Sequence, residues 1–75
     1  MSVDSDYVRF GDVARRRLGM QCQYACHYLE QPEIVENARW RGRVADYHGL
    51  TIHKDDVENF VERALAWRRA KGIIA

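Results

Sequence analysis

The sequence has no apolar run approaching the roughly 18 residues that cross a membrane, so no membrane partner is expected. Its first residues, Met1 to Asp6, are polar and acidic and lack the basic and apolar regions of a signal or transit peptide. A cytoplasmic location is therefore expected. The hydrophobic fraction of 47% is high enough for a folded core, and 75 residues suit one small domain.

Cysteine is also scarce, because only Cys22 and Cys26 occur, whereas a small secreted domain usually carries a disulfide framework. One helical turn apart, their Cβ atoms would lie roughly 5–6 Å from each other, against about 3.8 Å in a disulfide. We therefore expect two free thiols. With His27 they form a small cluster, but no second cysteine pair completes the four ligands that zinc takes, so no metal is expected.

Signatures of catalysis are missing as well. The sequence contains no nucleophile motif, phosphate-binding glycine loop or paired-carboxylate pattern. Cys26 beside His27 is not a catalytic dyad, because adjacent residues of a helix diverge by roughly 100°. We therefore expect neither an enzyme nor a cofactor.

The formal net charge is only +1, which argues weakly against a strong nonspecific nucleic-acid binder. The charge is nevertheless uneven along the chain. Between Arg9 and Arg43 there are seven arginines and four acidic residues, while the other acids gather in the N-terminal tail and between Asp46 and Glu62. A near-neutral total can therefore hide a basic face.

Glycine and proline mark the ends of the predicted helices. The first helix spans about Gly11 to Leu18 and ends at Gly19, since glycine just past a helical run is the usual C-terminal stop. The second spans about Gln21 to Gln31 and ends at Pro32, because proline disfavours helix in the residue before it. Residues 32–37 are either a loop or a single helical turn.

A β-hairpin is predicted next. Apolar or small residues alternate with arginines over residues 38–44, and this period of two is the signature of a strand. The arginines are Arg39, Arg41 and Arg43. Trp40 lies on the other face and is expected to anchor the strand to the core. A turn around residues 46–49 returns the chain to a second strand at Leu50 to Ile52.

A long final helix, about Asp55 to Arg69, carries its apolar residues at helical spacing, with Phe60 as a core anchor. The whole domain is expected to span residues 9–72. Residues 1–8 are predicted to be a flexible acidic tail, and residues 73–75 a C-terminal tail.

The predicted order of helix, helix, hairpin and helix is mainly α with a small β-hairpin, an α+β fold class. Three parts of the sequence resemble the winged helix-turn-helix heads of phage excisionases and MerR-type regulators. They are Asp12-Val13-Ala14 with Leu18-Gly19-Met20, Gln21 to Leu29 with Glu33-Ile34, and Leu50 to Val61. Three residues separate Ala14 from Leu18, one more than the usual spacing of that family.

The resemblance implies a small DNA-binding protein, either an excisionase-like factor in phage DNA recombination or a repressor in transcription regulation. Its second helix would enter the major groove, where glutamine bonds bidentately to adenine, and its arginine strand would follow the phosphates of double-stranded DNA. The predicted DNA-binding residues are Gln21, Gln23, Tyr24 and His27 on the helix, and Arg39, Arg41 and Arg43 on the strand.

An alternative is a small phage-type protein-binding inhibitor or adaptor with no nucleic-acid contact. The near-neutral charge and the lack of arginine or lysine in the second helix favour it. The arginines would then protect an edge strand from aggregation. Two alternatives are also open for Trp67, Ile73 and Ile74: self-association through the C-terminal helix, or folding back onto the same domain.

Overall fold

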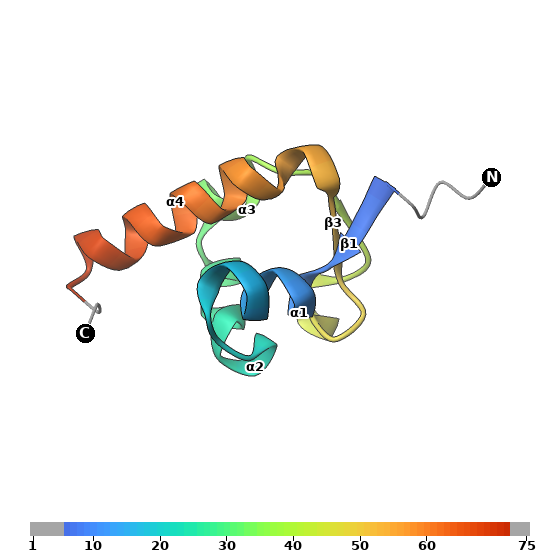
Figure 1. The fold of residues 1–75 in the computed structure, drawn as a ribbon, viewed down its shortest axis with the longest axis horizontal. Helices are drawn as coiled ribbons and strands as arrows, with labels where there is room; N and C mark the ends of the chain where they lie inside the picture. Colours follow the sequence, from blue (N-terminus) through green and yellow to red (C-terminus); the bar gives the residue numbers. More distant parts are fainter. Residues whose placement is uncertain (1–5, 73–75) are drawn as a thin grey trace.

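The computed structural model describes residues 6–72 (Figure 1). In chain order the elements are β1 (Tyr7–Arg9), α1 (Phe10–Val13), a π-helical turn η2 (Ala14–Leu18), α2 (Cys22–Ala25), a 3-10 segment η3 (Cys26–Glu30), α3 (Pro32–Val35), β2 (Trp40–Arg41), η4 (Val44–Asp46), β3 (Thr51–His53), η5 (Lys54–Asp56) and α4 (Val57–Ala70). The fold is mostly helical with a small antiparallel sheet, so the α+β class is confirmed. In Figure 1 the long helix α4 runs along one side of the domain, with α1 and α2 on the opposite side.

The first predicted helix is present as α1 followed directly by η2, and it ends at Gly19 as expected. Gly19 has a φ of 68°, in the left-handed region that glycine adopts without strain. Its backbone N–H donates to the carbonyl of Ala14, five residues earlier, which is the hydrogen bond of a π-helix. A π turn takes up one more residue than an α turn. The π turn accommodates the three residues between Ala14 and Leu18, and both of these side chains are buried.

The second predicted helix is also present, as α2 continued by η3. It ends at Gln31, which has extended backbone angles and precedes Pro32, the first residue of α3. Proline therefore both ends one helix and begins the next, where its missing N–H costs nothing. Of the two alternatives left open for this part of the chain, the single helical turn is the one observed.

The sheet has three strands in the order β1-β3-β2, all antiparallel, and not the two of the predicted hairpin. The additional strand is β1, which places Tyr7 and Val8 in the folded domain and not in the tail to which the sequence assigned them. Val8 pairs with Ile52 and packs against the core from the inner face of the sheet. A strand of three residues is too short to show a period, so the sequence carried no signal for it. The predicted tail at residues 73–75 lies outside the described residues.

The predicted arginine strand is shorter than expected. β2 contains only two residues, because Gly42 has a φ of 106° and turns the chain away from β3. A Cβ atom at this position would lie 3.2 Å from the carbonyl oxygen of Gly49 across the loop, so a side chain here would crowd that carbonyl in addition to straining the backbone. Arg43 consequently lies beyond the strand, immediately before η4.

The core lies between the inner face of the sheet and the helices. Its largest fully buried side chains are Phe10, Phe60, Ile34, Leu50 and Ile52. Trp40 packs its ring against both Phe10 and Phe60 and donates its indole N–H to the carbonyl of Val35 at 2.8 Å, so its predicted role as the anchor of the strand is confirmed. The longest helix, α4, has 14 residues, and no helix within residues 6–72 is long and apolar enough to cross a membrane.

Candidate nucleic-acid interface

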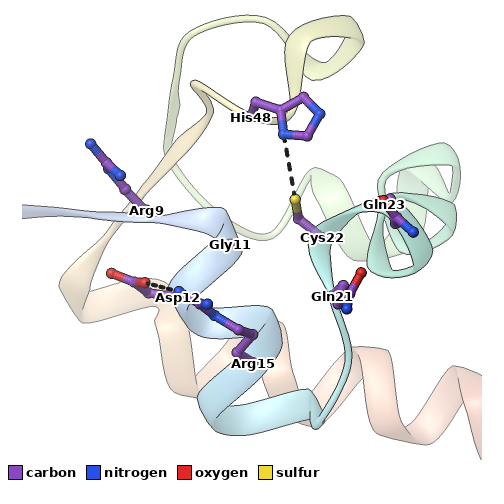
Figure 2. A pocket seen from close by; sticks show the side chains of 8 residues that line it. All are labelled: Arg9, Gly11, Asp12, Arg15, Gln21, Cys22, Gln23 and His48. Atoms are coloured by element: carbon purple, nitrogen blue, oxygen red, sulfur yellow. Dashed lines mark hydrogen bonds and ion pairs between the residues drawn. The ribbon is translucent and has the colours of Figure 1, made fainter.

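A hollow of about 330 Å³ lies where α1, the start of α2 and the β2–β3 loop (residues 42–50) meet (Figure 2). We call it the glutamine hollow. It is lined by two amide side chains, by three basic side chains, and by Gly11, Asp12 and Cys22. The amides are Gln21 and Gln23, and the basic residues are Arg9, Arg15 and His48. Side chains from three separate parts of the chain therefore converge on one concave surface.

The two glutamines are positioned by the start of α2. Gln21 has extended backbone angles, and its carbonyl accepts the N–H groups of Tyr24 and Ala25, each at 3.0 Å. This leaves the side chains of Gln21 and Gln23 exposed. Within residues 6–72, no other residue forms a hydrogen bond with either side-chain amide. Both amides are thus available to an external ligand.

The arginines of η2 point in different directions, as expected for consecutive residues. Arg15 faces the glutamine hollow, where it reaches Asp12 at 3.4 Å. Arg17 forms two hydrogen bonds with Glu58 of α4, at 2.5 and 2.7 Å, and these bonds lower the pKa of the Glu58 carboxyl. The Arg15 side chain is 71% exposed. An exposed pair of this length contributes little to stability, so Arg15 can exchange its carboxylate for another anion at small cost.

His48 was not among the predicted site residues, yet it forms one wall of the hollow. Its Nδ1 lies 3.6 Å from Sγ of Cys22, and this contact joins the β2–β3 loop to the first residue of α2 (Figure 2). The ring of Tyr47 packs beside the imidazole, with the ring centroids 4.5 Å apart. No periodic pattern could have revealed this residue, because it lies in a loop and its partner is 26 positions away.

The other two predicted helix residues, Tyr24 and His27, lie in a different hollow of about 420 Å³. We call it the tryptophan hollow, because Trp67 and Arg68 of α4 form its other side, with Met20 and Tyr28. The structure therefore divides the four predicted residues of the second helix between two surfaces. Gln21 and Gln23 lie on one, and Tyr24 and His27 lie on the other.

The predicted arginines do not form a single row. Arg39 and Arg41 flank Trp40 and lie on the outer face of the sheet, as expected, but Arg39 is held by Asp56. The Asp56 carboxylate accepts the backbone N–H and Nε of Arg39 at 2.8 and 2.9 Å, and these bonds lower its pKa. The guanidinium of Arg41 stacks over the ring of Tyr7, 4.4 Å from its centroid. Arg39 thus joins the sheet to the start of α4.

A different arginine pair is formed by the strand that the sequence did not predict. Arg9 of β1 and Arg41 of β2 both pair with Thr51 of β3, so they lie on either side of it on the outer face of the sheet. Arg9 also lines the glutamine hollow. It therefore connects the hollow with the outer face of the sheet.

The two cysteines are free. Cys26 donates its thiol to the carbonyl of Gln23 at 3.1 Å, within its own helix. Within residues 6–72, no three side chains of histidine, cysteine, aspartate or glutamate are grouped closely enough to hold a metal ion.

No known protein family, characterised protein or solved structure shows detectable similarity to this chain.

Proposed function

We propose that this chain is a small winged helix-turn-helix protein that binds double-stranded DNA through the glutamine hollow. It acts as an architectural or regulatory factor, of the kind that directs recombination or represses transcription. The observation that carries the proposal is the hollow itself. Two amides without partners in the described residues, Gln21 and Gln23, lie there between the exposed basic side chains of Arg9, Arg15 and His48.

The two chemistries in the hollow match the two parts of a DNA site. An α-helix fits the major groove, and glutamine offers the donor and acceptor pair that recognises adenine. In helix-turn-helix proteins it is the first residues of the second helix that reach the base edges, which is where Gln21 and Gln23 lie. The arginines can hold the phosphates on either side and so set the orientation of the helix.

The fold order supports the same reading. Under this proposal, α1 with η2, the turn at Gly19, and α2 with η3 form the helix-turn-helix, and the β2–β3 loop is its wing. The extra residue before Leu18 is compatible with this arrangement, since the π turn keeps Ala14 and Leu18 in the core.

The distribution of charge also supports the proposal, although the net charge is only +1. Arg17 and Arg39 are neutralised by Glu58 and Asp56 on the side of α4. Arg9 is exposed and forms no ion pair with a described residue. Because the glutamine hollow offers only three basic side chains to phosphates, we expect a shallow salt dependence. Three phosphate contacts would give a slope of log K against log salt of roughly −3.

The test begins with selection from random duplexes, which should enrich a preferred site. Gln23→Ala should then lower affinity for that site by about 1–3 kcal/mol and leave binding to scrambled DNA unchanged. Arg9→Ala should weaken binding to both and reduce the salt slope by about one. Arg63→Ala, on an exposed position of α4 outside the hollow, is the matched control and should change neither.

The proposal fails if no sequence is enriched and neither Gln23→Ala nor Arg9→Ala changes DNA binding. A protein-binding inhibitor or adaptor would then be the better description of this chain.

A further inference from the structure

The tryptophan hollow is a second concave surface that the proposed DNA contact does not use. Its floor is aromatic, since Tyr28 and Trp67 meet edge to face with their centroids 5.6 Å apart. Tyr24 stands at its edge with 58% of its surface exposed, the most exposed large apolar side chain within residues 6–72. Met20 completes the apolar lining. Exposed aromatic groups around a cavity are typical of binding surfaces.

The indole N–H of Trp67 is a donor without an acceptor. It is buried, and it has no hydrogen-bond partner among the described residues. The other tryptophan of the chain differs, because Trp40 donates to a backbone carbonyl at 2.8 Å. Buried donors are nearly always paired in folded proteins, so the unpaired indole of Trp67 is one of the few exceptions within residues 6–72.

The charge around the hollow is mainly positive. Arg68 lines it, Arg69 follows in the last turn of α4, and Lys71 is the residue just after that helix. Within residues 6–72, neither Arg68 nor Arg69 has a carboxylate at ion-pair distance, and Lys71 lies 6.0 Å above the ring of Trp67. Glu30 is the carboxylate among the lining residues. An apolar floor with cations beside it complements a segment that combines apolar and acidic side chains.

We propose that the tryptophan hollow binds an acidic peptide segment of a partner protein. An apolar side chain of that segment packs on Tyr28 and Trp67, and a carboxylate pairs with Arg68. A peptide fits better than duplex DNA, because DNA presents phosphates on its outside and no side chain that could enter an apolar hollow. This surface is separate from the glutamine hollow, so the inference does not depend on DNA binding.

The test uses the full chain and a displayed library of random peptides. Selection should enrich peptides with aspartate or glutamate beside a large apolar residue. For an enriched peptide, Arg68→Glu and Tyr24→Ala should each weaken binding by about tenfold or more, as for the loss of an interface anchor. The matched controls, Arg43→Glu and Val44→Ala, change exposed residues of the β2–β3 loop and should leave the affinity unchanged.

Nuclear magnetic resonance supplies an independent readout. On adding the peptide, the indole N–H resonance of Trp67 should shift, whereas that of Trp40 should stay in place because its hydrogen bond is internal. The inference is overturned if no peptide is enriched, if the enriched peptides are basic, or if they bind the Arg68→Glu variant as well as the wild type. It is also overturned if the peptide leaves the Trp67 resonance unshifted, or if duplex DNA shifts that resonance and displaces the peptide.

Discussion

Phe60→Ala should remove much of the stability of this domain. Phe60 is fully buried in α4, and its ring meets those of Phe10 and Trp40 edge to face, with centroids 6.1 and 5.2 Å apart. Truncating a buried phenylalanine to alanine costs about 3–5 kcal/mol. The two aromatic contacts, each contributing about 0.5–1.5 kcal/mol, favour the upper part of that range. At about 0.05–0.15 kcal/mol per residue, a chain of 75 residues has only about 4–11 kcal/mol in total.

Urea unfolding followed by far-ultraviolet circular dichroism measures this change, and the wild type and the variant are compared at the same protein concentration. Asn59→Ala is the matched control, since Asn59 is the exposed neighbour of Phe60 on the same helix and should change stability by no more than about 0.5 kcal/mol. If Phe60→Ala unfolds within about 1 kcal/mol of the wild type, as an ordinary substitution does, the face of α4 assigned to the core is wrong.

Two further predictions concern a loop and an ion pair. Gly19→Ala should lower the free energy of unfolding by about 1–2 kcal/mol, because alanine is strained at the left-handed φ of this position, although its Cβ atom would meet open space. Gly42→Ala should lower it further, since the added Cβ atom would also approach the Gly49 carbonyl. Thermal unfolding compares the two variants, and the reverse order would contradict this prediction. Arg39 lowers the folded-state pKa of Asp56, so this carboxylate contributes stability above its unfolded pKa of about 3.9 that is lost as pH falls through the folded value. Between about pH 5 and 2, the free energy of unfolding should therefore depend less on pH in Asp56→Asn than in the wild type. Equal slopes of this free energy against pH in the two proteins would disprove the linkage.

The sequence by itself determined the features that depend on neighbouring residues. Gly19 and Pro32 end the first two helices because their effects on the backbone are local. The helical spacing of apolar residues was sufficient to place Phe60 in the core, and the alternation around Trp40 was sufficient to turn its ring inward and Arg39 outward. In each case the covalent chain sets the direction of the side chain.

Only the tertiary structure decided which distant groups meet. β1 forms because Val8 pairs with Ile52 across the sheet, and a segment of three residues is too short for its hydrophobic pattern to predict a strand. His48 faces Cys22 because the β2–β3 loop folds over the start of α2, which depends on packing across 26 positions of sequence. The sequence pattern of the second helix predicted a single exposed surface for Gln21, Gln23, Tyr24 and His27. It is the placement of α1 and α4 around that helix that divides them between two hollows.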